Sequence, residues 1–294
     1  PGKTFASDWT PFAFSLSLPI ATFIAIKYFL PYYRASQEVS AYSLLENRFG
    51  PWARVYASTF YLLTQFARAG MVLYLMALPL SVILGVPIGS LLIITGLVVT
   101  AYALVGGLVA VIWTDALQAI VLIVGAITCL LVILFSLPGG PTEMFEIAHE
   151  NSKFAFSDMD LSAFGRQTFW VVLLNGLFIN LQNFGIDQSY VQRYIAASSE
   201  KEARKSVWMG GLLYVPVSAV FFLIGTALFT LYTAKPQQLE EVRVAAATRA
   251  AIQETGSTSG VAFDARVTAI ARDTSDSAIA DQAFPYFIGK TLPI

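Results

Sequence analysis

Charged side chains are scarce in this sequence. Only 13% of its residues are Asp, Glu, Lys or Arg, against about 25% in a soluble domain. A chain so poor in charge cannot cover a water-facing surface, and its mean hydropathy of +0.65 points to a lipid bilayer as its surroundings. The net charge of −1 excludes a basic nucleic-acid-binding face. A single cysteine, Cys129, excludes a disulfide framework and a cysteine metal site.

The sequence contains several long apolar runs. Between Val55 and Thr142 the only charged residues are Arg68 and Asp115. Stretches long enough to cross about 30 Å of hydrocarbon define the expected spans. They fall at about 10–31, 55–84, 89–109, 111–137, 167–187 and 206–233. The sequence therefore predicts an all-α, polytopic membrane protein. Its expected spans hold too few titratable groups for the active site of an enzyme.

Lys and Arg give the expected orientation. The linkers at about 32–54 and 188–205 carry several basic residues, whereas the linker at 138–166 is acidic. Because cytoplasmic loops carry an excess of Lys and Arg, we expect the first two inside and the third outside. The polar stretch 234–282 then falls outside, as a solvated and partly helical loop. Pro1 is not a natural start and the sequence turns apolar again near its end, so we expect a part of a longer protein.

The second span carries a polar face. Tyr61, Thr64, Gln65 and Arg68 are spaced i, i+3, i+4, i+7, which places them on one side of a helix. An isolated charge in a bilayer costs about 2.5–3.5 kcal/mol or more, so Arg68 needs a function or a counter-charge. One interpretation is a cavity in which Arg68 holds an anion bidentately. The other is a structural ion pair with Asp115.

Two more spans carry candidate polar groups. Thr114 and Asp115 begin the fourth span, where hydroxyl and carboxylate oxygens suit a hard cation such as sodium; the alternative is a carboxylate held by the helix dipole. In the fifth span, Asn180 and Asn183 share a face near Gly185. They suggest either a locally opened helix that binds substrate or ion, or interhelical hydrogen bonding.

Several motifs resemble those of the sodium/solute symporter family, which includes sodium/glucose, sodium/galactose and sodium/sialic acid cotransporters. They are SAYSLLENRF at 40–49, Gly106-Gly107 followed by VIWTDALQ at 111–118, Asp187-Gln188, VQRY at 191–194 and SEKEA at 199–203. The resemblance implies the LeuT-like five-plus-five inverted-repeat fold, with core helices two to seven present. It also implies a main sodium site built from the first and eighth core helices, mostly outside this segment.

The resemblance also implies roles for individual residues. Asp115 matches an aspartate on the sodium exit path, which in sialic acid transporters helps to form a second sodium site. Arg68 matches the arginine with which those transporters bind the substrate carboxylate, where galactose transporters have asparagine. Asn180 matches a substrate contact of the galactose transporters. Phe184 stands at the second position of their Tyr-Trp gate pair, and Asn183 replaces the tyrosine.

Other matches of this kind lie near the start of the chain. Residues 7–9, Ser-Asp-Trp, resemble the sialic acid branch. Ser15 stands where that branch has glutamine and the galactose branch has glutamate, and its hydroxyl could also bond back to its own helix.

These observations predict a multi-pass protein of the cell membrane, of the bacterial inner membrane type. We expect it to use sodium as coupling ion for the symport of a small polar solute, such as the sugar acid sialic acid. Its expected partners are the solute, sodium and lipid, and no nucleic acid. Two alternatives stay open: symport of a neutral sugar or polyol with sodium, and a transporter-like sensor domain of a signalling protein.

Overall fold

The computed structural model describes residues 1–36, 40–84, 86–156, 159–160, 165–255 and 259–291. Helices make up its regular elements, and the described residues contain no strand. In chain order they are α1 (Gly2–Ala6), η1 (Thr10–Phe12), α2 (Ala13–Ile24), η2 (Ala25–Phe29), α3 (Leu30–Ser36), α4 (Ala41–Phe49), α5 (Pro51–Leu84), α6 (Ile88–Ser136), α7 (Gly140–Glu150), α8 (Phe169–Ile186), α9 (Gln188–Ala196), α10 (Glu200–Ala234), α11 (Pro236–Thr255), α12 (Val261–Asp273) and α13 (Asp276–Thr291).

Six helical stretches of the described chain are long and apolar enough to cross a membrane. They are Thr10–Ser36, Pro51–Ala77, Ile88–Gly107, Ala110–Ser136, Phe169–Ile186 and Glu200–Ala234. Each overlaps one of the six apolar runs of the sequence. Many of their large apolar side chains are exposed, including Phe66 at 74% and Trp113 at 74%, as expected where a span meets lipid or another helix.

Gly107 makes the turn between the third and fourth spans. Its φ of 58° and ψ of −159° interrupt the helical backbone within α6. Residues that carry a side chain rarely adopt a positive φ, whereas glycine does so without a steric cost. One glycine thus reverses the chain direction, and the two spans need no longer loop.

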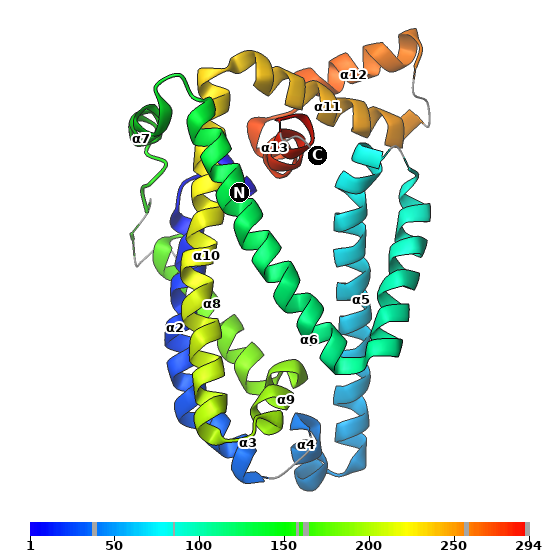
Figure 1. Ribbon diagram of the computed structural model, residues 1–294, viewed down its shortest axis with the longest axis vertical. Helices are drawn as coiled ribbons and strands as arrows, with labels where there is room; N and C mark the ends of the chain where they lie inside the picture. Colours follow the sequence, from blue (N-terminus) through cyan, green and yellow to red (C-terminus); the bar gives the residue numbers. More distant parts are fainter. Residues whose placement is uncertain (37–39, 85, 157–158, 161–164, 256–258, 292–294) are drawn as a thin grey trace. The chain divides into compact units, whose positions relative to one another are not determined.

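The chain divides into two compact units, each described here by itself. The first unit comprises residues 1–18, 123–178 and 211–294. Its core joins α1, the second half of α6, α7, α10, α11 and α13 through buried apolar side chains such as Ile133, Leu228 and Ile279. In Figure 1, α13 lies beside α11. Helix α11 and the start of α13 belong to the stretch 234–282 that is expected outside the membrane.

Lys153 anchors the segment after α7 within the first unit. The side chain is 7% exposed, and its ammonium donates hydrogen bonds to the carbonyls of Phe5 (2.8 Å) and Ser7 (3.0 Å). The same ammonium lies 3.8 Å from the centre of the Phe229 ring. These contacts compensate a buried charge and join this segment to α1 and α10.

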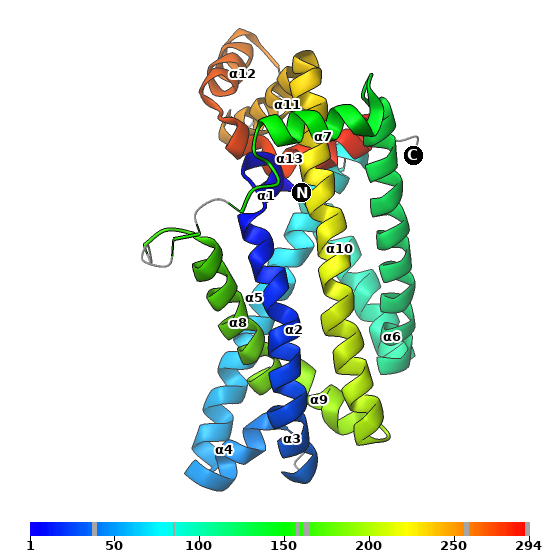
Figure 2. The same cartoon turned by 90° about the vertical axis from the view of Figure 1, so that its left-hand side faces the viewer.

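The second unit comprises residues 19–122 and 179–210. At one of its ends α3, α4, α9 and the start of α5 lie together, as both ribbon views show (Figures 1 and 2). Two tyrosines hold the end of α8 there. The Tyr33 hydroxyl donates to the Gly185 carbonyl at 2.5 Å, and the Tyr194 hydroxyl donates to the Phe184 carbonyl at 2.9 Å. Both carbonyls belong to the last turn of α8. The carbonyls of a last turn have no N–H donor within their own helix, and the two tyrosines supply one.

The fifth span is not opened at Gly185, contrary to one interpretation of its sequence. Helix α8 continues to Ile186, and the break falls at Asp187, whose ψ is 121°. A Cβ atom on Gly185 would lie 3.1 Å from the Phe29 ring, tighter than ordinary van der Waals contact. This glycine therefore serves close packing against η2 rather than an unwound backbone.

Candidate functional site

The polar face of α5 is present in the structure and lies open. Arg68 and Thr64 are exposed, and Gln65 is half-buried. The Thr64 hydroxyl donates to the Phe60 carbonyl of its own helix at 2.8 Å. A hydroxyl oxygen keeps its lone pairs after such a donation and can still accept a hydrogen bond. The face can therefore offer a guanidinium, an amide and a hydroxyl to one ligand.

The structural ion pair between Arg68 and Asp115 does not form. Both side chains are exposed, and neither has an ion pair or hydrogen bond within the described part of the second unit. The cost of Arg68 in an apolar span is thus not offset by this carboxylate. The ion pair with Asp115 is thus absent among the described residues, and the binding of an anion by Arg68 stays a prediction.

Thr114 and Asp115 lie in α6, two turns after Gly107. Thr114 is half-buried, and its hydroxyl donates to the Val111 carbonyl at 2.9 Å, which leaves the oxygen free to bind a cation. The described residues contain no cluster of three or more His, Cys, Asp or Glu that could hold a metal ion. A cation site at the Thr114 hydroxyl and the Asp115 carboxylate would therefore need further ligands, and it stays a prediction.

The candidate residues of α8 differ in exposure. Asn180 is 6% exposed and Phe184 is 5% exposed, whereas Asn183 is half-buried. The Phe184 ring packs edge-on against Tyr190 of α9, with 5.2 Å between the ring centres. Phe184 thus belongs to the packing at the α8–α9 break, and Asn183 remains partly accessible.

Ser15 lies in the first unit, so it is described apart from the others. It is 3% exposed, and its hydroxyl shares a hydrogen bond of 2.7 Å with the hydroxyl of Ser218 in α10. Nearby, the Trp9 indole N–H donates to the Thr226 hydroxyl at 3.0 Å. Both interactions join the start of the chain to α10.

Sequence reasoning missed a polar cluster at the α8–α9 break. Tyr61 of α5 shares a hydrogen bond of 3.0 Å with the Ser189 hydroxyl and donates to Asp187 Oδ1 at 3.4 Å. Asp187 caps α9, because the same oxygen accepts from the Ser189 N–H at 2.8 Å. An aspartate directly after an apolar run is a helix N-cap signal that would have located this break.

Tyr42 of α4 completes the cluster. Its ring centre lies 5.7 Å from that of Tyr61. Burial, followed by the neighbouring Tyr61 and Asp187, raises the pKa of Tyr42 to about 12. The Tyr42 hydroxyl therefore stays protonated at neutral pH.

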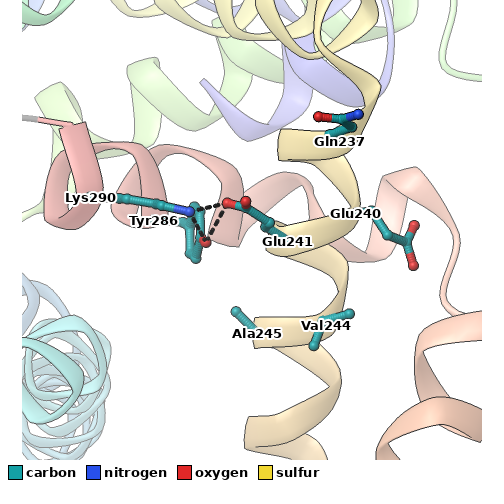
Figure 3. Close-up of a pocket in the computed structure, with 7 residues that line it drawn as sticks. All are labelled: Gln237, Glu240, Glu241, Val244, Ala245, Tyr286 and Lys290. Atoms are coloured by element: carbon teal, nitrogen blue, oxygen red, sulfur yellow. Dashed lines mark hydrogen bonds and ion pairs between the residues drawn. The ribbon is translucent and has the colours of Figure 1, made fainter.

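A separate pocket of about 540 Å³ lies between α11 and α13 of the first unit. Figure 3 shows its lining side chains, with Lys290 directed toward Glu241 and Tyr286. Lys290 forms an ion pair with Glu241, and the Tyr286 hydroxyl donates to the same carboxylate at 3.2 Å. The Lys290 hydrogen bond holds the pKa of Glu241 below its ordinary value. Because the cation is already paired within the protein, this pocket is a weak candidate for an anion.

Comparison with known proteins identifies the family. The sequence profile described as "Sodium:solute symporter family" matches residues 1–261. The chain belongs to this family. The match covers most of its length, including every helix that carries a candidate site residue, and it makes this a multi-pass membrane protein of a transporter family.

Similar members of the family have names that include their solutes. The sodium/sialic acid symporter SiaT of Proteus mirabilis is 33% identical over 240 residues, covering 81% of this chain and 48% of that protein. The sodium-coupled monocarboxylate transporter 2 of Mus musculus is 33% identical over 223 residues, covering 75% of this chain and 36% of that protein. The chain thus spans half or less of the length of these relatives.

A solved structure shows the same fold. It is the substrate-bound, outward-open state of a sodium-coupled sialic acid symporter, with a novel sodium site. It matches with a TM-score of 0.76 at 27% identity, covering all of this chain and 55% of that one. The predicted LeuT-like, all-α fold and the predicted family are thereby confirmed.

Proposed function

We propose that the protein carrying this chain couples sodium entry to the uptake of a small carboxylate-bearing solute such as sialic acid. The observation that carries the proposal is Arg68, an exposed guanidinium in an apolar span that has no counter-charge among the described residues. A planar guanidinium binds a carboxylate through two parallel hydrogen bonds. Sialic acid and monocarboxylates, the solutes in the names of two similar symporters, both offer that group.

The other candidates fit the same solute. Thr64 and Gln65 lie on the helical face of Arg68, where they would donate to or accept from groups beside the carboxylate of the solute. Asn180 and Asn183 of α8 would bind other polar groups of the solute, with Phe184 packed behind them. A contact of Ser15 with the solute stays a prediction from the resemblance. Such convergent polar groups in an otherwise apolar setting are typical of small-molecule sites.

Asp115 and Thr114 would act on sodium. Hydroxyl and carboxylate oxygens bind hard cations well, and the two side chains lie together at the start of the fourth span. We place them on the sodium path or in a second sodium site, as the resemblance to sialic acid transporters implies. Solute and cation would then cross by alternating access, in which one bundle of helices moves against another around the site.

Uptake by purified protein tests the proposal. The full-length protein, reconstituted in liposomes, should accumulate radiolabelled sialic acid or a monocarboxylate under an inward sodium gradient. A potassium gradient of the same size should give no accumulation. Sodium-driven uptake of neutral sugars in place of every carboxylate tested would contradict the anionic substrate. Solute uptake that is indifferent to sodium would contradict the coupling.

A further inference from the structure

Tyr61 stands between the candidate anion site and one end of the second unit. It shares its helical face with Arg68, seven residues further along α5. At 1.5 Å per residue the two side chains are separated by about 10 Å along the helix axis. The basic linkers place the Tyr61 end of α5 at the cytoplasm. Any solute released from Arg68 to the cytoplasm along this face must therefore pass Tyr61.

The hydroxyl of Tyr61 joins α5 to the start of α9. Its hydrogen bond with Ser189 is 3.0 Å long, and its longer contact with Asp187 Oδ1 is 3.4 Å. Asp187 is fixed in place as the cap of α9, through the Ser189 N–H. Both partners of Tyr61 thus belong to the start of α9, and the Tyr61 hydroxyl joins that start to α5.

A second contact joins the same two sides. The Ala41 N–H, at the start of α4, donates to Gln188 Oε1 of α9 at 3.0 Å. Helix α4 in turn packs against α5, and the Tyr42 ring lies against that of Tyr61. Helices α4 and α5 therefore form one wall, and hydrogen bonds that involve the side chains of Tyr61 and Gln188 join the first turn of α9 to it.

We propose that Tyr61, with Ser189 and Asp187, is a latch that closes the route from Arg68 to the cytoplasm and opens when the solute is released. Alternating access requires such a closure on the side away from the open one. Such contacts suit the purpose, because the neutral Tyr61–Ser189 hydrogen bond contributes little net stability and the contact with Asp187 is long, at 3.4 Å. The proposal rests on the transport function proposed above.

Thiol labelling measures whether the latch is closed. A cysteine at Thr64, between Tyr61 and Arg68 on the same face, reports access from the cytoplasm. It is placed in the full-length protein after every native cysteine, including Cys129, has been replaced. Inside-out vesicles are treated with a membrane-impermeant maleimide, and the labelling rate is compared with and without Tyr61→Phe.

Loss of the hydroxyl should favour the open state. Since one neutral hydrogen bond has a small net value, labelling should rise about two- to tenfold. Tyr61→Phe keeps the aromatic ring and its packing on Tyr42, so the fold is retained. Tyr56→Phe is the matched control, because Tyr56 is an exposed tyrosine of the same helix whose ring contacts Phe60. It should leave the labelling rate unchanged.

A double variant tests whether Tyr61 and Ser189 act through one bond. Ser189→Ala alone should also speed labelling, and adding it to Tyr61→Phe should give little further increase. Equal labelling of the Tyr61→Phe and Tyr56→Phe proteins, or fully additive effects in the double variant, would overturn the latch.

Uptake by the protein with native Thr64 separates the two proposals. If that protein shows no sodium-driven uptake of any solute, the proposed function fails. If it transports while Tyr61→Phe leaves labelling unchanged, the latch alone fails.

Discussion

At the scale of single residues, the structure separates side chains that have partners within the fold from those that have none among the described residues. Lys153 and Arg68 are both cations of a largely apolar protein. Lys153 is buried, and its ammonium is bonded to two main-chain carbonyls and lies over an aromatic ring. Arg68 is exposed and unpaired among the described residues. In the sequence Arg68 lies within a long apolar run and Lys153 does not. Only Arg68 was therefore predicted to have a special role.

We expect Lys153→Met to destabilise the protein. The aliphatic stem is retained, but the carbonyls of Phe5 and Ser7 lose their donor, and a buried polar group without a partner costs about 1–3 kcal/mol. Thermal unfolding of the full-length protein in detergent should show a lower Tm. Lys201→Met, at an exposed position of α10, is the control. An unchanged Tm for Lys153→Met would show that these bonds add nothing to the fold.

Asp115 should govern the response to sodium rather than solute recognition. Asp115→Asn keeps the size of the side chain but removes the charge that a cation requires. In proteoliposomes, the full-length variant should need more sodium for half-maximal uptake or show a lower Hill coefficient, with a similar preference among solutes. An unaltered sodium titration would leave the carboxylate with a helix-dipole role only.

At the scale of elements, apolar length predicted the spans and missed how they end. Six apolar runs indicated six helices, because crossing a bilayer requires about 20 apolar residues. The break at Asp187 was not predicted, since it depends on a capping side chain rather than on hydrophobicity. Gly185 was interpreted as a site of unwinding, but its role depends on Phe29, a residue far away in the sequence. Contacts between distant segments are what a single sequence conceals.

Outside the spans, the ion pair of Glu241 and Lys290 joins α11 to α13. The Lys290 hydrogen bond lowers the pKa of Glu241 from its ordinary 4.5, and the Glu241 hydrogen bond raises that of Lys290 from 10.5. The carboxylate therefore contributes stability above pH 4.5, which is lost as the pH falls through its lowered pKa. The ammonium contributes below pH 10.5, and its part is lost as the pH rises through its raised pKa.

We predict that Glu241→Gln loosens the attachment of α13 to α11 between pH 4.5 and pH 10.5. At neutral pH, hydrogen–deuterium exchange of peptides from α13 should be modestly faster than in the wild type, since exposed ion pairs are weak and screened by salt. The difference should shrink as the pH falls below 4.5. Glu240→Gln is the control, because Glu240 pairs with Arg243 of its own helix. Equal exchange in wild type and Glu241→Gln at neutral pH would contradict the assignment.

At the scale of the whole molecule, the arrangement across the membrane follows from a few charges. We predict that the α9–α10 linker lies in the cytoplasm and α7 lies outside. In a cysteine-free full-length background, a cysteine at Glu150 should react with an impermeant thiol reagent added to intact cells. A cysteine at Lys201 should react only after the membrane is opened. The reverse pattern would invert the topology and move the Tyr61 latch to the outer side.

Less of the candidate site than of the fold could be predicted from the sequence. The helical spacing placed Tyr61 and Arg68 on one face, because that depends on neighbours within one helix. The pairing of Arg68 with Asp115 could not be decided from sequence, since it depends on the positions of two different helices. Ser15 and Arg68 lie in separate units, and their use by one solute stays a proposal.

The proposed anion site at Arg68 carries the proposed function, and substrate discrimination tests it most directly. Binding of a sugar acid and of its uncharged amide is measured by calorimetry on the full-length protein. Wild type should prefer the acid by about ten- to a hundredfold, the value of a charged hydrogen bond in a desolvated site. Arg68→Ala should lose that preference, Arg68→Lys should recover little because it lacks the planar fork, and Arg54→Ala, on an exposed arginine, should keep it. An Arg68→Ala protein that still prefers the acid as strongly as the wild type would contradict the account.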